Sequence, residues 1–199
     1  TPTPSSAASD VYKRQENLTK NDLSIGKYAG LGLFIVSLAD IATFLSGGEE
    51  RIALIAYVQS LCFATAFWYM RKLLAENNIS QFADFNLVLA SIIPAAFTVI
   101  DLSNPGQLTL SGDQPISTSA GGLYFSITLA IIFLNSKGVL GNIFRYLCVI
   151  GATIFFAFGA AQNLFGVELP DTIQILGAVG YLSVVTGVGL GSFMAWNKK

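Results

Sequence analysis

Six apolar stretches separated by short polar gaps run along this 199-residue chain. Each is close to the ~20 residues that a helix needs to cross ~30 Å of hydrocarbon. The stretches cover residues 28–46, 52–70, 83–101, 118–136, 143–165 and 173–196. The pattern therefore predicts an all-α membrane protein, with six transmembrane helices in one bundle over residues 28–197.

The charges in the polar gaps alternate in sign along the chain. From residue 16 onward, basic residues precede the first stretch, follow the second and the fourth, and end the chain; they are Lys20, Lys27, Arg71, Lys72, Lys137, Arg145, Lys198 and Lys199. Acidic residues dominate the other gaps, in which Arg51 is the one basic residue. Basic residues favour the cytoplasmic side of a membrane. The alternation thus predicts that both termini are cytoplasmic.

Two segments before the first stretch are set apart from the predicted bundle. Residues 5–15, SSAASDVYKRQ, resemble the translation of a sequencing-library adapter. We therefore interpret residues 1–15 as an artefact that forms no domain. Residues 16–27 are polar and are expected to be an N-terminal lead-in to the six-helix domain.

Composition excludes several classes of function. Hydrophobic residues make up 53% of the chain and charged residues 12%, against about a quarter charged in soluble domains. The basic residues are scattered, which argues against nucleic-acid binding. The chain has no histidine, which removes His-ligated metal and haem sites and Ser-His-Asp triads. Cys62 and Cys148 fit buried apolar positions, or a disulfide if their helices touch. We expect no cofactor, no metal site and no enzymatic activity.

Two sequence features bear on how the predicted helices pack. Pro94 lies within the third stretch, where it is expected to kink the helix or break its hydrogen-bond ladder. The sixth stretch is rich in glycine, and Gly187 and Gly191 have the spacing of a helix-packing motif. We expect the glycines of the first and sixth stretches to face other helices.

Asp40 is the strongest candidate for a functional residue, because it lies within the first apolar stretch. A carboxylate in hydrocarbon costs several kcal/mol, so we expect it to face protein or water and to favour its protonated form. One interpretation is a protonatable site in a permeation path. The alternative is a carboxylate at the outer rim that reaches water or pairs with Arg51.

Other polar residues in or near the stretches have two interpretations each. Gln59, Gln162 and Asn163 could bind a carboxylate substrate or form hydrogen bonds between helices. Arg145 could attract anions or anchor the topology. Asp84 suits a helix N-terminus, where it is expected to act as a cap, and Asp101 suits an interfacial helix end.

Several short motifs resemble the acetate uptake transporter family, the succinate–acetate permeases. The motifs are Ala29-Gly30-Leu31-Gly32-Leu33-Phe34 with Ala42-Thr43-Phe44-Leu45-Ser46, the ending Phe63-Ala64 to Arg71-Lys72, Phe156-Ala157-Phe158 with Asn163 and Gly166, and Gly177-Ala178-Val179-Gly180. The third stretch departs from the family pattern and reads FNLVLAS at 85–91.

The resemblance implies a transporter or channel for small monocarboxylates such as acetate, with proton coupling as an option. It implies a pore in each subunit of a ring-shaped homo-oligomer, a trimer or a hexamer. The residues expected along the substrate path are Asp40, Asn163, Leu33, Val36, Val88, Ala152 and Gly187. The expected partners are a small organic anion and the lipid bilayer, and the expected location is the plasma (inner) membrane, as a multi-pass protein.

A second hypothesis is a non-catalytic structural or assembly subunit of a larger membrane complex. It accounts for the glycine-rich faces, the low charge and the lack of a catalytic constellation in the sequence.

Overall fold

The structure is a computed structural model that describes residues 20–45, 53–75, 79–103, 127–165, 167 and 170–199. Helices form the regular structure of these residues, apart from one isolated bridge between Lys137 and Leu140. The helices are α2 (Lys20–Leu45), α3 (Ala53–Ala75), α4 (Gln81–Ser103), α6 (Asn142–Phe165), α7 (Asp171–Val185), the π-helix η1 (Thr186–Leu190) and α8 (Gly191–Trp196). Residues 127–135 are also helical.

The helices follow the predicted apolar stretches closely. Within the described residues, three helices contain a segment long and apolar enough to cross a membrane: Asn21–Thr43, Gln81–Ile100 and Ile175–Trp196. The all-α prediction is therefore confirmed for these residues. Of the fourth stretch, residues 118–126 lie outside the described part, as do the segment 1–15 and Arg51.

One boundary differs from the prediction. The polar lead-in was expected to extend to residue 27, but α2 already begins at Lys20. Asp22 lies in the first turn, where a negative charge stabilises the positive end of the helix dipole. Leu23 packs against the core, so the added turns bury apolar surface.

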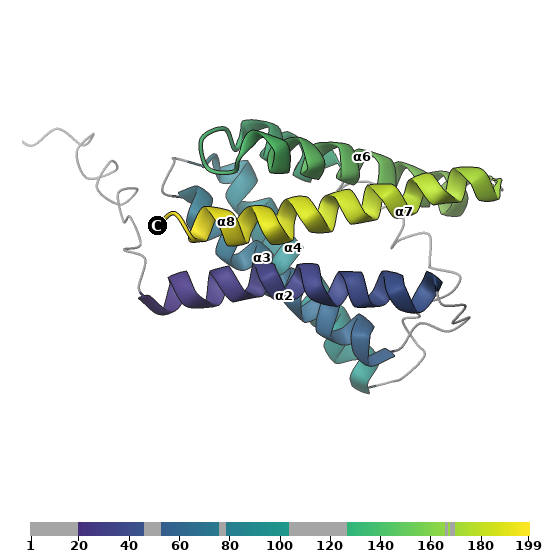
Figure 1. The fold of residues 1–199 in the computed structure, drawn as a ribbon, viewed down its shortest axis with the longest axis horizontal. Helices are drawn as coiled ribbons and strands as arrows, with labels where there is room; N and C mark the ends of the chain where they lie inside the picture. The colour runs from purple at the N-terminus through teal and green to yellow at the C-terminus, as the bar shows by residue number, and fades with distance from the viewer. Residues whose placement is uncertain (1–19, 46–52, 76–78, 104–126, 166, 168–169) are drawn as a thin grey trace, which may run out of the picture.

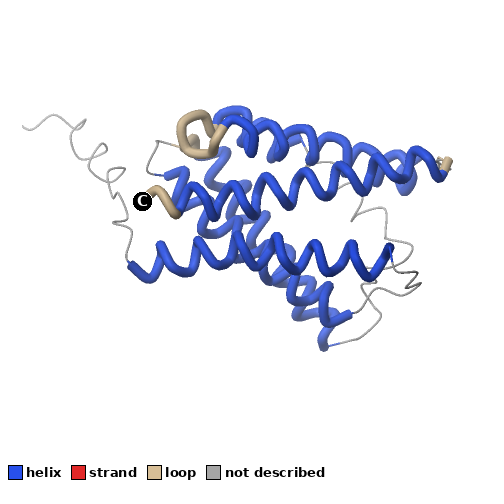
Figure 2. Tube along the Cα trace, in the orientation of Figure 1, coloured by secondary structure: helices blue, strands red, loops and turns tan. Residues whose placement is uncertain are grey.

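The helices pack lengthwise in pairs (Figures 1 and 2). α3 packs against α4, α6 against α7, and α2 against both α3 and α8. η1 contacts α2 on one side and α6 on the other. The sixth apolar stretch, which forms α7, η1 and α8, therefore lies between α2 and α6 and contacts both.

Glycines allow these close contacts. A Cβ on Gly30 of α2 would lie 2.6 Å from the carbonyl oxygen of Gly189 in η1. A Cβ on Gly187 would lie 2.5 Å from Sγ of Cys148 and 2.8 Å from the backbone oxygen of Phe144. Both glycines therefore sit where a side chain would collide with a neighbouring helix. The expectation that the first and sixth stretches pack through their glycines is confirmed at these positions.

Pro94 does not end its helix. α4 runs from Gln81 to Ser103 and contains Pro94 in its interior. Ser91, which precedes the proline by three residues, donates its hydroxyl to the backbone oxygen of Ala64 in α3 at 2.8 Å. This bond joins α4 to α3 one turn before the proline, where the two helices pack together.

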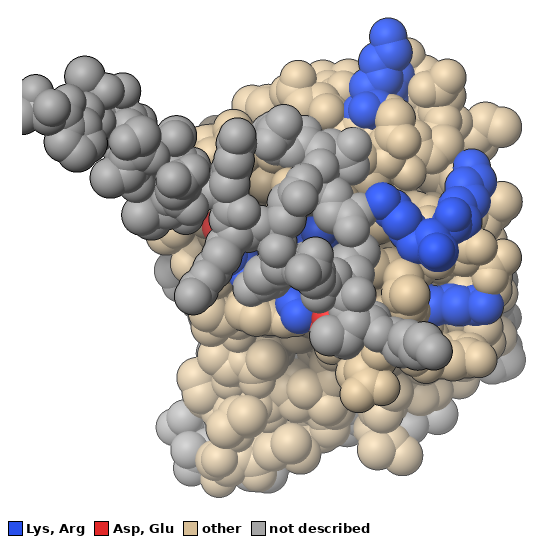
Figure 3. All heavy atoms as spheres, turned by 90° about the vertical axis from the view of Figure 1, so that its left-hand side faces the viewer, with Lys and Arg blue, Asp and Glu red and all other residues tan. Residues whose placement is uncertain are grey.

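One end of the bundle gathers the basic residues, and we call it the basic end (Figure 3). It is formed by the starts of α2, α4 and α6, the end of α3 and the C-terminus. Its basic residues with described side chains are Lys27, Arg71, Lys72, Lys137, Arg145, Lys198 and Lys199. The opposite end receives the end of α4, with Asp101, and the start of α7, with Asp171.

Ion pairs and hydrogen bonds join the helices at the basic end. Nζ of Lys72 lies 2.9 Å from Oδ1 of Asp22, which joins α3 to α2. Nε of Arg71 lies 2.5 Å from Oδ1 of Asp84, which joins α3 to α4. Asp84 lies in the first turn of α4, as expected, and the Oγ of Ser80 accepts a hydrogen bond from the Ala83 amide at the helix start. A hydroxyl directly before the helix reaches that amide, whereas the Asp84 carboxylate turns to Arg71.

Candidate functional site

Four polar side chains meet between three of the apolar helices, and we call them the Gln59 cluster. They are Ser37 and Asp40 of α2, Gln59 of α3 and Tyr181 of α7. Nε2 of Gln59 lies 3.1 Å from Oγ of Ser37 and 3.4 Å from Oδ2 of Asp40. The same nitrogen donates to the hydroxyl of Tyr181.

Helix geometry explains why the cluster forms. Ser37 and Asp40 are three residues apart, so they share one face of α2. Gln59 approaches that face because α3 packs along α2. Tyr181 completes the cluster from α7. Ser37 is fully buried and Gln59 is 4% exposed, whereas Asp40 and Tyr181 are partly buried.

The central amide has fewer protons than acceptors. The nitrogen of Gln59 carries two hydrogens but faces three oxygen acceptors. At most two of these bonds can be fully made at one time, so the three acceptors compete for the amide.

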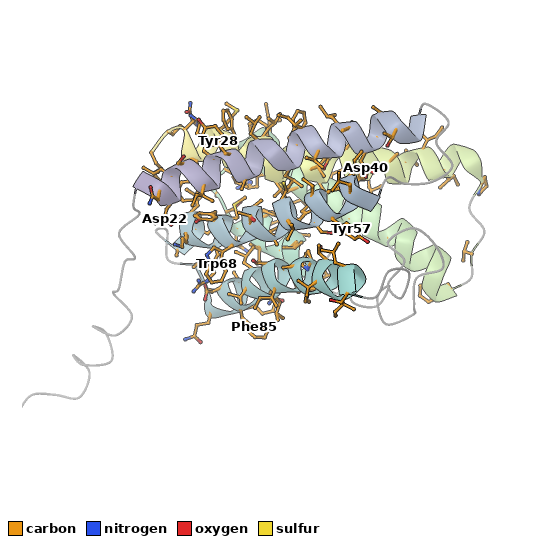
Figure 4. The ribbon with its side chains drawn as sticks, turned by 90° about the horizontal axis from the view of Figure 1, so that it is seen from below. Asp22, Tyr28, Asp40, Tyr57, Trp68 and Phe85 are labelled. Carbon is orange, nitrogen blue, oxygen red and sulfur yellow. The ribbon has the colours of Figure 1, made fainter. Side chains whose placement is uncertain are left out.

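Asp40 lies inside an apolar helical segment, Asn21–Thr43. An ionisable side chain in such a segment is costly and faces the protein interior or a wet cavity. Figure 4 shows Asp40 on α2 and Tyr57 on α3 away from the basic end, where Asp22 lies. Oδ2 of Asp40 lies 3.4 Å from Nε2 of Gln59, and both interpretations of Asp40 stay predictions. The alternative partner Arg51 lies outside the described residues.

The other residues expected along a substrate path lie in different surroundings. Leu33 and Ala152 are both 0% exposed. Leu33 belongs to the main apolar core, and Ala152 packs with Val184 and Val185, against which Tyr181 also rests. Ala152 is therefore close to the Gln59 cluster through Tyr181. Gly187 faces Cys148 and Phe144 of α6.

The three remaining candidates are Val36, Val88 and Asn163. Val36 and Val88 are partly buried. Asn163 lies near the end of α6, but its side chain, like that of Gln162, is outside the described residues. The role of these residues in a path stays a prediction.

Sequence reasoning identified Asp40 and Gln59 but missed Ser37 and Tyr181. Hydroxyl groups are common in apolar helices because they can bond to their own backbone, as Thr153 and Ser183 do here. The available signal was the three-residue spacing from Ser37 to Asp40. No comparable signal marked Tyr181, because its helix approaches α3 only in the folded bundle.

The described residues offer no candidate metal site. Within the ranges that the structure describes, no three side chains of His, Cys, Asp or Glu lie together in a way that could hold a metal ion. Cys62 and Cys148 are both free thiols, so the disulfide alternative is wrong. The Gln59 cluster offers amide and hydroxyl groups around one carboxyl group, which suits hydrogen bonding.

Comparison with family models, curated proteins and solved structures gives no match. The functional argument therefore rests on the residues of this chain.

Proposed function

We propose that this protein is a membrane transporter or channel for small monocarboxylates such as acetate, with Asp40 on the path. The observation that carries this proposal is the Gln59 cluster, in which an ionisable group within an apolar helix meets polar groups from two other helices. Ionisable residues inside membrane helices mark substrate and proton pathways. The proposal includes no enzymatic step.

The proposed membrane arrangement has six spans, with the basic end and both termini in the cytoplasm. The gathering of lysine and arginine at one end supports this orientation (Figure 3). Large apolar side chains that point outward along the helices, such as Ile35, Leu54 and Ile143, support contact with lipid. We place the protein in the plasma (inner) membrane as a multi-pass protein.

The charge of Asp40 sets the mechanism that we propose. Two like charges 4 Å apart repel by ~4 kcal/mol at an effective dielectric constant of about 20. A carboxylate substrate would therefore pass only when Asp40 is protonated, or the substrate would cross as the neutral acid. The amide of Gln59 and the hydroxyl groups of Ser37 and Tyr181 are groups that can hydrogen-bond a carboxyl group. Each subunit of a homo-oligomer, a trimer or a hexamer, would contain one such path.

Uptake of radiolabelled acetate into proteoliposomes tests the proposal. Both versions of the mechanism predict that uptake rises as the pH falls from about 7.5 to about 5.5. The reason is that a larger fraction of carboxyl groups is protonated at lower pH. Asp40→Asn imitates the protonated residue, so it should retain passage and flatten the pH dependence. Asp84→Asn is the matched control, because it neutralises a carboxylate at the basic end, away from the cluster.

A second substitution tests the other end of the expected path. Asn163→Leu removes a hydrogen-bonding group from α6 and should reduce uptake while the protein remains folded. If neither Asp40→Asn nor Asn163→Leu changes the uptake or its pH profile, both residues are structural and this mechanism is wrong.

A non-catalytic structural or assembly subunit is the second candidate function, and two observations favour it. The groups of the Gln59 cluster hydrogen-bond one another, as interhelical bonds commonly do in membrane bundles. The contacts at Gly30 and Gly187 also close the interior tightly. A structural subunit would carry no acetate, lactate or succinate and would co-purify with a large partner.

A further inference from the structure

A cavity of about 400 Å³ opens at the basic end, separate from the Gln59 cluster. It lies between the end of α3, the start of α4, the helix 127–135 and the turn that follows this helix. Its volume falls within the range of about 300–1,000 Å³ that is typical of small-molecule sites. Its apolar wall includes Leu74, Ile79, Ala83, Ile131, Ile132 and Val139.

The polar residues that line the cavity differ in the hydrogen-bond donors that they can offer a ligand. Asn135 donates its side-chain amide to the backbone oxygen of Ile131, and Ser136 donates its hydroxyl to that of Phe133, both at 2.8 Å. The Ser136 hydroxyl hydrogen is therefore used within the protein, whereas the Asn135 amide has a second hydrogen. Ser80 accepts a hydrogen bond from the Ala83 amide, so its own hydroxyl hydrogen remains to donate.

Lys137 gives the cavity a positive charge. Its side chain is exposed, and among the described residues it forms no ion pair. α4 begins at this cavity with Gln81, and the start of a helix carries partial positive charge. Asp84 opposes this charge, but its carboxylate is paired with Arg71 at 2.5 Å. The cavity therefore combines an apolar wall with cationic and hydroxyl groups.

We propose that this cavity holds an anionic phospholipid of the surrounding bilayer. The phosphate would lie at Lys137 and Ser80, and an acyl chain would lie along the apolar wall. Two residues of the lining, Phe82 and Ile131, are also exposed on the outer surface, so the cavity is continuous with a face that suits lipid. This inference requires that the protein lies in a membrane, but it does not require transport.

Lipid retention by the full-length protein tests the inference. The protein is reconstituted in nanodiscs that contain equal amounts of phosphatidylglycerol and phosphatidylcholine, and the lipids retained after extraction are counted by native mass spectrometry. We expect phosphatidylglycerol to be retained preferentially. Lys137→Ala should weaken this retention, because it removes the cationic group that lines the cavity.

Lys198→Ala is the matched control. Lys198 is also an exposed lysine at the same end of the bundle, but it does not line the cavity. Equal losses in the two variants would overturn the proposal, because they would indicate a general effect of surface charge. Equal retention of the two lipids by the unmodified protein would also overturn it.

Two further measurements separate the phospholipid from other occupants. Ala83→Leu would fill the cavity and should abolish retention. The melting temperature of this variant shows whether it folds. If it does not fold, the comparison of Lys137→Ala with Lys198→Ala still tests the proposal. Inorganic phosphate at millimolar concentration should leave the retained lipid in place. Displacement by phosphate would indicate a free anion as the ligand instead. None of these readouts depends on acetate uptake, so failure of the proposed function would be distinguishable.

Discussion

Gln59 is the residue on which the polar interior depends, because one amide nitrogen serves acceptors on two other helices. Gln59→Leu would remove the amide from all three acceptors, with a cost of about 1–3 kcal/mol for buried polar groups that lose a partner. Tyr181→Phe removes one acceptor only, and single interhelical bonds in membranes average about 0.6 kcal/mol. Unfolding of the purified protein in mixed micelles with increasing denaturing detergent would measure both losses.

Gln81→Leu is the control for this comparison, since it makes the same substitution at an exposed residue at the start of α4. We expect it to leave the free energy of unfolding almost unchanged. If Gln59→Leu and Gln81→Leu lower it equally, the cluster does not stabilise the bundle.

The sequence predicts only part of this cluster, and the reason is geometric. Asp40 and Gln59 are conspicuous because charged and amide groups are rare in apolar helices. Their contact depends on how α2 and α3 are rotated about their axes, and apolar stretches that are hydrophobic all round carry little information on rotation. Ser37 and Tyr181 therefore became candidates only when the packing of the helices was known.

At the scale of the helices, glycine positions decide which contacts are possible. Gly187 and Gly189 lie in η1 and face opposite neighbours, Cys148 of α6 and Gly30 of α2. The extra residue per turn of a π-helix adjusts the direction of the following residues. The apolar pattern predicted one unbroken sixth helix, since hydropathy does not distinguish a π-turn from an α-turn. The glycines themselves were the readable signal for close packing.

Gly187→Leu tests this packing. A leucine would have to displace the backbone of Cys148 and Phe144, which lie 2.8 Å from the position of a Cβ. Overpacking of this kind costs about 1–3 kcal/mol, and more where the backbone cannot move. We expect a lower midpoint of unfolding and a loss of assembled protein in size-exclusion chromatography.

Gly177→Leu provides the matched control for the same stretch. A Cβ on Gly177 would meet no heavy atom of the described residues within 4 Å. This variant should therefore keep the midpoint of the unmodified protein. Unchanged stability of Gly187→Leu would mean that the contact between η1 and α6 does not hold the bundle together.

At the scale of the whole molecule, the charge pattern of the sequence agrees with the arrangement of the helices. The charge alternation in the sequence predicted that the basic residues would share one side, and the structure gathers those with described side chains at one end of the bundle (Figure 3). This agreement was predictable because successive helices reverse direction, which needs only the number of stretches and the lengths of the gaps. A path to Asn163 stays a prediction, since it depends on contacts between helices distant in sequence.

Cysteine labelling with a membrane-impermeant reagent tests the orientation of the whole bundle. Cys62 is replaced by alanine, whereas Cys148 is retained because it is fully buried. Single cysteines are then placed at Lys20, Leu110 and Lys199. We expect labelling of positions 20 and 199 from the cytoplasmic side and of position 110 from the outside only, because the basic end favours the cytoplasm.

A fourth cysteine at Ile35, which is 56% exposed in the isolated chain, should stay unlabelled from both sides if lipid covers it. Labelling of position 110 from the cytoplasmic side would refute the orientation, and ready labelling of position 35 would show that this face of α2 meets water.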